Sequence, residues 1–244
     1  MIYILLPAYN EELDIGRLLA RIEQVLVVTK LPIQILVVND GSKDNTVGVV
    51  QSFKGRIPFE ILEHSENKGL GQAMLTGLTR AAELAKSDDL IVAMDADNTH
   101  DPALITTMIQ RIDSGYDLVI ASRYVPGGAE IGLTSLRKVL SRGASFLLRL
   151  FFPIQGAQDY TCGYRAYRGS LLLTAFQKYE QNLIRECGFT CMAELLIKLS
   201  WLGARIAEVP LVLRYDLKSG QSKMKFVKTI SRYCVLIYTL KRTW

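Results

Sequence analysis

A cluster of carboxylates directly follows an apolar run in the middle of the chain. The stretch "MDADNTHDP" (94–102) comes after "LIVA" (90–93) and places Asp95 and Asp97 two residues apart. Like charges repel and aspartate is poor inside a strand, so the cluster fits a strand end at which a cation neutralises it. In extended backbone two such side chains share a face, and together they can bind one Mg²⁺ or Mn²⁺ that also binds substrate phosphates. A solvated turn is the alternative interpretation.

The rest of this stretch has structural interpretations. Asp101 and Pro102 are typical of the cap and first turn of a helix, so we predict a structural role for Asp101. His100 is near enough in sequence to contact the ion or the phosphates, and a supporting role behind the ion ligands is an equal alternative.

A second carboxylate ends another apolar run, in "VVNDGSKDNT" (37–46). Asp40 closes the run, Gly41 permits a tight turn, and Asp44 and Asn45 are typical of the start of a helix. A carboxylate at a strand end can accept hydrogen bonds from a base or a ribose. It can equally accept them from its own loop. Both interpretations of Asp40 stay open on this motif alone.

The bulk composition is that of a globular protein. The chain has 244 residues, 49% hydrophobic and 22% charged, with a formal net charge of +5. This mild basic excess suits phosphate-bearing ligands or an anionic membrane surface, and we expect no nucleic-acid partner. The four cysteines form no CxxC pair, so we do not expect a structural zinc site. We expect reduced thiols in a cytosolic setting. We expect no signal peptide and no membrane-spanning helix, since no apolar run approaches ~20 residues.

Apolar runs and amphipathic segments alternate along the first half. The predicted strands are 2–6, 33–38, 59–62, 90–94 and 117–121, and the predicted helices lie near 11–28, 44–53, 70–86 and 101–114. This alternation predicts an α/β fold with a mostly parallel sheet and helices on both faces. Ligands of such sheets bind at the carboxyl ends of the strands, where the polar motifs fall. The second half is less regular, with predicted helices at 135–152 and 189–202 and a strand at 204–213.

Several motifs in their order along the chain resemble glycosyltransferase family two, which has the GT-A nucleotide-sugar fold. They are "LLPAYNEE", "VVNDGSKDNT", "NKGLGQAMLTG", "MDADNTHDP" and "ASRYVPGG". The last of them, with "LRKVLSRGAS", "GYRAYR" and "SGQSKM", is most similar to the polyprenyl-phosphate mannose (dolichol-phosphate mannose) synthase branch. The resemblance covers roughly residues 2–226.

The resemblance implies roles for individual residues. Pro7, Tyr9 and Glu11 would line the base and ribose pocket, and Asp40 would bind the nucleoside. Asp95 and Asp97 would bind a divalent metal, Mg²⁺ or Mn²⁺, on the diphosphate, with Ala96 beside them. Lys223 and a basic residue near "SGQSK" would close over the donor phosphates. The arginine expected there falls on Leu217, which leaves Lys218 or Arg214.

On the acceptor side, the resemblance places a lipid phosphate on Arg123, Arg137 and Ser141, with Arg123 and Asp97 as the residues that serve catalysis. The guanidinium fork suits phosphate better than an ammonium does. A phosphate monoester is already largely ionised at neutral pH, with a second pKa of about 6, so no strong general base is required. Asp159 is a candidate base, and a turn role is the alternative.

The lipid acceptor implies contact with a membrane. The segment 143–154 is apolar nearly all round, and the tail from 225 sets Lys225, Lys228 and Arg232 three and four residues apart. Such basic amphipathic helices lie in the membrane interface. Packing into the core or a dimer contact is the alternative.

We therefore predict a GT-A catalytic domain over 1–226 and an amphipathic membrane-interface tail over 227–244. The domain would consist of a nucleotide-sugar half, 1–122, and an acceptor half, 123–226. The location would be cytoplasmic, peripheral at the cytosolic face of a membrane. A separate membrane-anchoring subunit is a further candidate partner.

The leading hypothesis is an inverting transferase that moves mannose from GDP-mannose to a polyprenyl phosphate. Three alternatives are weighed: UDP-glucose or another donor, a nucleotidyltransferase, and a non-catalytic sugar-nucleotide- or lipid-binding module. A nucleotidyltransferase would need a glycine-rich phosphate loop after the first strand, and "LPAYNEE" has no glycine. A non-catalytic module would need a broken ion site, and Asp95 and Asp97 are both present.

Overall fold

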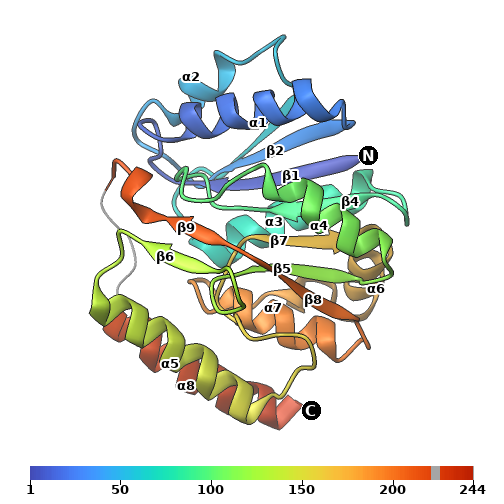
Figure 1. The fold of residues 1–244 in the computed structure, drawn as a ribbon, viewed down its shortest axis with the longest axis vertical. Helices are drawn as coiled ribbons and strands as arrows, with labels where there is room; N and C mark the ends of the chain where they lie inside the picture. The colour runs from blue at the N-terminus through green and yellow to red at the C-terminus, as the bar shows by residue number, and fades with distance from the viewer. Residues whose placement is uncertain (221–225, 244) are drawn as a thin grey trace.

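The carboxyl ends of parallel strands meet at one edge of a twisted sheet. The computed structural model describes residues 1–220 and 226–243 of the chain. Within them, the main sheet has the strand order β3-β2-β1-β4-β7-β5-β8, and all neighbours run parallel except β7, which is antiparallel to β4 and β5 (Figure 1). The mostly parallel sheet predicted from the sequence is confirmed. The strands are β1 (Ile2–Ala8), β2 (Ile33–Asn39), β3 (Phe59–Glu63), β4 (Leu90–Ala93), β5 (Leu118–Ser122), β7 (Arg165–Arg168) and β8 (Ile206–Pro210).

Helices cover both faces of this sheet. α3, α6 and α7 pack on one another on one face, and α4 packs against β5, β7 and β8 from the other (Figure 1). The helices are α1 (Ile15–Thr29), α2 (Thr46–Gln51), α3 (Leu70–Leu84), α4 (Leu104–Asp113), α5 (Ser135–Phe151), α6 (Gly169–Tyr179), α7 (Cys191–Ser200) and α8 (Phe226–Thr243). Two short 3-10 helices, η1 (Glu180–Leu183) and η2 (Tyr215–Leu217), complete the list.

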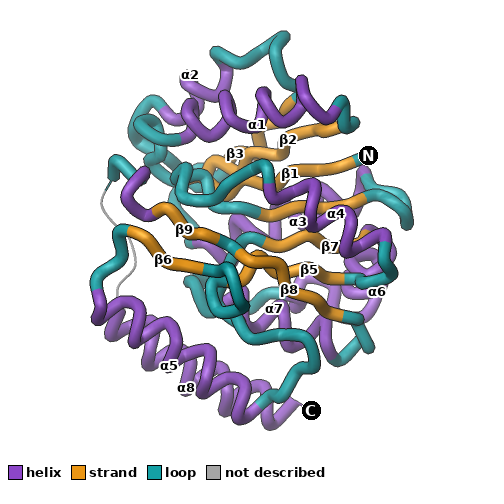
Figure 2. Tube along the Cα trace, viewed as in Figure 1, coloured by secondary structure: helices purple, strands orange, loops and turns teal. Residues whose placement is uncertain are grey.

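A small second sheet lies beside the carboxyl edge of the main one. It pairs β6 (Ala129–Ile131) with β9 (Val212–Arg214) in parallel (Figure 2). The predicted strand 204–213 is therefore two strands: β8 in the main sheet and β9 in the small one. A run of alternating apolar residues gives no sign of such a change of sheet.

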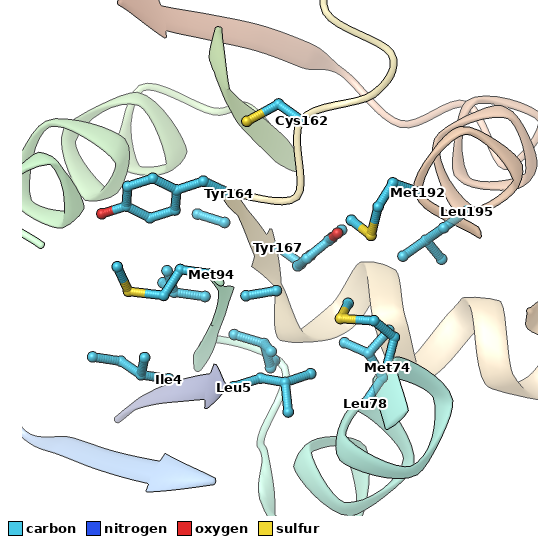
Figure 3. Close-up of a cluster of buried hydrophobic side chains, with 14 of the residues drawn as sticks. Ile4, Leu5, Met74, Leu78, Met94, Cys162, Tyr164, Tyr167, Met192 and Leu195 are labelled. Carbon is cyan, nitrogen blue, oxygen red and sulfur yellow. The ribbon is translucent and has the colours of Figure 1, made fainter. Parts of the chain in front are cut away.

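The core between sheet and helices is built from aliphatic and aromatic side chains. Met74 and Leu78 of α3 and Met192 and Leu195 of α7 pack on one side of the sheet, while Tyr164 points to the other (Figure 3). α3 can approach β1 closely because Gly77 has no side chain. A Cβ at this position would lie 2.1 Å from Leu5 Cδ1. A larger residue at Gly77 would push the helix off the sheet.

The strand order reverses between β1 and β4. The chain moves outward from β1 to β2 and β3, and then returns to β4 on the other side of β1. β1 pairs with β4 only as far as Leu5, opposite Ala93, but with β2 as far as Ala8. Pro7, which lacks an N–H, therefore lies beyond the β4 ladder and removes no hydrogen bond from it. A reversal of this kind is where open α/β sheets bind ligands.

α5 and α8 form a pair of helices at one end of the molecule (Figure 1). Their carboxyl-terminal ends meet where the Lys241 ammonium lies 4.5 Å from the Phe151 ring centroid. Each helix buries one face, with Leu148 in α5 and Leu236 and Leu240 in α8. No helix among the described residues is long and apolar enough to cross a bilayer.

Candidate active site

The two aspartates of the DAD motif lie in different surroundings just beyond β4. The Asp95 backbone N–H donates to His100 Nδ1 at 3.2 Å, so the imidazole proton is on Nε2, which lies 3.8 Å from Asp95 Oδ2. His100 is buried and stacks on Tyr164 at 5.0 Å between ring centroids. A Cβ on Gly163 would lie 3.1 Å from Asp95 Oδ1, so the absent side chain leaves room beside this carboxylate. The buried His100 ring thus fixes the backbone position of Asp95.

Asp97 is bound by a lysine distant in sequence. Lys218 Nζ donates to Asp97 Oδ2 at 2.7 Å and lies 3.9 Å from Glu11 Oε1. The other oxygen of Asp97 accepts from the Thr99 N–H and hydroxyl. Arg214, the alternative basic residue, instead forms a paired contact with Asp216. Of these two residues, the structure brings only Lys218 to the DAD motif.

Burial and neighbouring charges shift the pKa values of Asp95, Asp97 and Lys218. Burial alone would raise the pKa of Asp97, but Lys218 outweighs it and keeps that pKa below its ordinary value. Burial would lower the pKa of Lys218, but Asp97 and Glu11 hold it above its ordinary value. The Asp95 side chain is 41% exposed, and neighbouring protein atoms desolvate its carboxyl group only in part. This desolvation, with the charge of Asp97 adding to it, raises the pKa of Asp95.

Asp40 directly follows β2, and its carboxylate accepts hydrogen bonds from the chain itself. Oδ1 accepts from the Lys68 N–H at 2.9 Å and lies 2.7 Å from His64 Nδ1, while Oδ2 accepts from the Gly69 N–H at 2.9 Å. The tight turn at Gly41 is confirmed by its φ of +69°. Asp40 therefore joins β2 to the start of α3, and its binding to a nucleoside stays a prediction.

The remaining residues predicted for the base and ribose pocket surround the same edge. Pro7 is the penultimate residue of β1, and Tyr9 and Glu11 follow it in the β1–α1 loop. Ala96 is buried between the two aspartates. Lys223 lies outside the described residues, as does Lys225. The structure thus brings the described members of the predicted donor set to the carboxyl ends of β1, β2 and β4.

Arg123 lies just beyond β5 in a buried network of carboxylates. Its Nε and Nη2 each donate at 2.7 Å to one oxygen of Asp159, and Nη2 also donates to Thr161 Oγ1 at 2.7 Å. Nη1 makes a longer contact of 3.4 Å with Glu130 Oε1. Asp159 is fully buried, and although burial acts to raise its pKa, the Arg123 charge and hydrogen bonds hold that pKa below its ordinary value.

Asp159 is therefore arranged as the partner of an arginine. Its oxygens also accept from the Thr161 and Cys162 N–H groups. A general base needs a free lone pair directed at the acceptor, and these contacts favour the structural alternative for Asp159.

The other residues predicted for the acceptor phosphate come from α5. Ser141 Oγ lies 2.8 Å from Tyr124 Oη, and the Arg137 guanidinium carbon lies 5.3 Å from the centroid of the Tyr215 ring. Burial raises the pKa of Tyr124 to about 12, so the phenol stays protonated. Arg142, which sequence analysis did not assign to this site, lies over the Tyr124 ring at 5.8 Å. The Tyr124 ring thus contacts Arg123 and the exposed Arg142, and the Tyr215 ring contacts the half-buried Arg137.

The DAD loop is held by residues that no sequence motif indicated. Arg21 in α1 donates from Nη1 to Asn98 Oδ1 at 3.0 Å and to the His100 carbonyl at 3.1 Å. Its Nη2 donates to Asp101 Oδ1 at 2.9 Å. Asp101 also accepts from the Ala103 N–H just before α4, as its predicted structural role requires. Nothing in the spacing of Arg21 within an amphipathic helix distinguishes it from a solvated side chain.

The donor set fits a divalent ion held jointly with a ligand. Among residues 1–220 and 226–243, no three His, Cys, Asp or Glu side chains converge on one point as a complete protein cage. Mg²⁺ commonly takes one or two carboxylates and completes its shell with water and substrate phosphates. Asp95 and Asp97 match that partial set, and the absent side chain of Gly163 avoids a close contact with Asp95 Oδ1.

A cavity lies elsewhere in the molecule. It measures about 1010 Å³ and lies between the carboxyl-terminal ends of α5 and α8 and the start of β8. Phe151, Phe152, Trp201 and Lys241 are among its lining residues. It opens at the amino-terminal end of β8, whereas the polar motifs lie at the carboxyl ends of the strands.

This architecture, with its carboxylates beyond β4, is that of the GT-A glycosyltransferases. The model of Glycosyl transferase family 2 matches residues 3–174, and the chain belongs to this family. In structure it is similar to glucosyl-3-phosphoglycerate synthase from Mycobacterium tuberculosis in complex with Mn²⁺, UDP and phosphoglyceric acid. The TM-score is 0.68 at 21% identity, covering 98% of this chain and 77% of that one. The complex with Mg²⁺ and UDP gives a TM-score of 0.66 at 20% identity, covering 98% and 78%. At this identity the likeness concerns the fold.

Relatives in sequence cover most of the chain. It is 33% identical to the dolichol-phosphate mannosyltransferase of Pyrococcus furiosus over 98% of its length, and it spans 63% of that relative. It is 30% identical to the polyprenol monophosphomannose synthase of Mycolicibacterium smegmatis, covering 91% of this chain and 80% of the relative. The undecaprenyl-phosphate mannosyltransferase of Micrococcus luteus is also 30% identical, covering 90% and 86%.

Proposed function

We propose that the protein is an inverting glycosyltransferase that moves mannose from GDP-mannose to a polyprenyl phosphate with a divalent metal. The names of the sequence relatives support the mannosyl donor and the lipid acceptor. The observation that carries the proposal is that the cationic groups at one edge of the sheet form two sets. Lys218 lies on Asp97, whereas Arg123 and Arg142 lie against the Tyr124 ring and Arg137 lies against the Tyr215 ring. Two such sets suit a donor diphosphate and an acceptor monophosphate.

The transfer requires little proton chemistry from the chain. An ionised oxygen of the acceptor phosphate forms a bond to the anomeric carbon of the sugar, and the bond from that carbon to the β-phosphate oxygen breaks with inversion. Lys218 donates to the departing diphosphate, whose negative charge grows in the transition state. The α5 arginines orient the acceptor phosphate for attack from the opposite side. A bound Mg²⁺ or Mn²⁺, held by Asp95 and Asp97, would neutralise the same diphosphate.

Transfer assays with a panel of donors test this proposal. GDP-mannose, UDP-glucose and UDP-mannose are each supplied with Mn²⁺ and a short water-soluble prenyl phosphate, and the sugar phosphate product is quantified. Melting with each nucleotide is followed in parallel, because a ligand of the native state raises apparent stability. GDP-mannose should give the product and the larger rise in melting temperature. Transfer from UDP-glucose alone would establish the alternative donor, whose nucleotide is the one bound by the structural neighbours.

Replacing an α5 arginine should impair acceptor use selectively. We predict that Arg137→Ala raises the KM for the prenyl phosphate about tenfold or more, since a phosphate contact by a charged donor contributes ~1.5–3 kcal/mol. Nucleotide affinity should change less than twofold. Arg149→Ala, which removes an exposed arginine from the far end of the same helix, is the matched control with a soluble acceptor. Loss of nucleotide affinity in Arg137→Ala would move this residue to the donor side.

The outer face of the α5–α8 pair is apolar and exposed. Leu136, Val139, Phe146 and Leu150 of α5 are each more than 60% exposed, and Tyr238 of α8 is 63% exposed. The α5 residues follow one another at helical spacing, with Arg142 and Arg149 exposed among them. Such a surface fits the interface of an anionic membrane, and we propose peripheral attachment there at the cytosolic face.

This attachment should depend on the exposed α5 side chains. We predict that Val139→Gln/Phe146→Gln/Leu150→Gln reduces flotation with anionic liposomes several-fold and slows transfer to long-chain acceptors, while transfer to a soluble prenyl phosphate is retained. The substitutions leave the buried face intact, so melting should remain cooperative. Val27→Gln/Val28→Gln, at equally exposed positions of α1, is the matched control. Equal flotation of the α5 variant and the control would contradict the proposed surface.

A further inference from the structure

Asp14 holds a distant segment of the chain instead of its own helix. It occupies the N-cap position of α1, but its side chain makes no cap hydrogen bond. Its carboxylate is buried and accepts from the Ser219 N–H, at 2.9 Å to Oδ2 and 3.2 Å to Oδ1, and from the Gly220 N–H at 3.4 Å. These partners are 205 and 206 residues away in sequence.

Arg17, one turn further along α1, strengthens this contact. Its Nη1 lies 3.6 Å from Asp14 Oδ1 and donates to Ser219 Oγ at 2.6 Å. Burying a carboxylate is unfavourable unless hydrogen bonds and charge compensate it. Here the compensation comes from segment 219–220, from Arg17 and from the positive end of the α1 dipole. The buried charge and the position of the segment therefore depend on each other.

The same segment is fixed from its other end. β9 pairs with β6, and the Arg214 N–H donates to the Thr99 carbonyl at 3.0 Å. Lys218 lies between these two anchors, directly before Ser219. Because the backbone is held on both sides, the long lysine side chain reaches Asp97 at 2.7 Å with only 8% of its surface exposed. An unanchored loop would lose this geometry through its conformational freedom.

We propose that Asp14 is a positioning residue for the donor site, which holds residues 218–220 so that Lys218 meets Asp97 and the nucleoside diphosphate. The inference rests on the proposed function for the identity of that ligand. The alternative is that Asp14 only stabilises the start of α1. The absent cap hydrogen bond and the three contacts to Ser219 and Gly220 favour positioning.

A double-mutant cycle separates these two roles. Asp14→Ala should raise the KM for the nucleotide sugar about tenfold with a smaller change in kcat, and should weaken binding of the nucleoside diphosphate in Mn²⁺ equally. In a Lys218→Met background, the same substitution should add less than about twofold, because residues that act through one contact are not additive. Asp14→Asn keeps one acceptor for Ser219 and should be intermediate. An undiminished effect of Asp14→Ala in the Lys218→Met background would overturn the proposal.

Amide hydrogen exchange tests the anchor without any ligand. In the full-length Asp14→Ala protein, the amides of Ser219 and Gly220 should exchange at least about tenfold faster than in the wild type. Glu23→Ala is the matched control, because this α1 carboxylate pairs with Arg56 away from the site. Unchanged exchange in Asp14→Ala would overturn the inference. Accelerated exchange in a protein that binds no nucleotide would instead support the anchor and refute the proposed function.

Discussion

Asp97→Ala should lower the rate of sugar transfer by about 10²-fold or more, since a divalent ion stabilises developing charge by several kcal/mol. Asp97 is expected to bind that ion, and it also holds Lys218 at 2.7 Å. The substitution removes a loop carboxylate and no core volume, and Lys218 keeps Glu11 as an acidic neighbour at 3.9 Å, so the protein should still melt cooperatively. Transfer from the nucleotide sugar is measured over a Mn²⁺ titration, with melting followed on the same samples.

Asp101→Ala is the matched control for this prediction. It removes a carboxylate from the same loop, one that pairs with Arg21 and lies 57% exposed as a side chain. Transfer should stay within about threefold of the wild type, because exposed ion pairs contribute only ~0–1 kcal/mol. Near wild-type transfer by Asp97→Ala, with the metal still required, would show that the ion is bound elsewhere.

The first half of the fold could be predicted from the sequence because its strands are short apolar runs with polar ends. β1, β2, β4 and β5 were all predicted to within two residues at each end. A parallel strand that is buried on both faces is a nearly continuous apolar run, which makes it easy to identify in a sequence. The strand β7 was not predicted, since its sequence "RAYR" is charged at both ends. Arg165 is nevertheless fully buried, because it donates to the Met192 and Tyr160 carbonyls. Such compensation by distant carbonyls leaves no trace in a local pattern.

Some residues of the candidate site could likewise be predicted from the sequence and others could not. Asp40, Asp95 and Asp97 were found because each ends an apolar run, and the register of parallel strands brings such ends together. The choice between Arg214 and Lys218 could not be made, since both are basic residues only four positions apart in the sequence. It depends on the turn at η2 and on Asp14, 204 positions before Lys218 in the chain. The contacts of Arg21 and Asp14 join residues that are far apart in the sequence, so no local sequence pattern predicts them.

The interior position of Arg123 gives it a structural role in the fold, beside its proposed role at the acceptor site. We predict that Arg123→Ala lowers the free energy of unfolding by ~3–5 kcal/mol, because it leaves the buried carboxylate of Asp159 without its charged partner and that of Glu130 with Arg142 alone. Urea denaturation at pH 7, followed by tryptophan fluorescence, measures this loss. Arg142→Ala removes an exposed arginine that also faces Glu130, and as the matched control it should cost less than about 1 kcal/mol.

The same ion pair should make stability depend on pH on the acid side. Because Arg123 holds the pKa of Asp159 below its ordinary value, the carboxylate binds fewer protons in the folded protein than in the unfolded chain. Its stabilisation is therefore complete above the unfolded pKa of about 4 and is lost as the pH falls through the folded pKa. Asp159→Asn should remove this acid-side loss and destabilise the protein at pH 7.

Wild-type stability of Arg123→Ala, with only the KM for the lipid phosphate raised, would instead identify Arg123 as a ligand of the acceptor without a structural role.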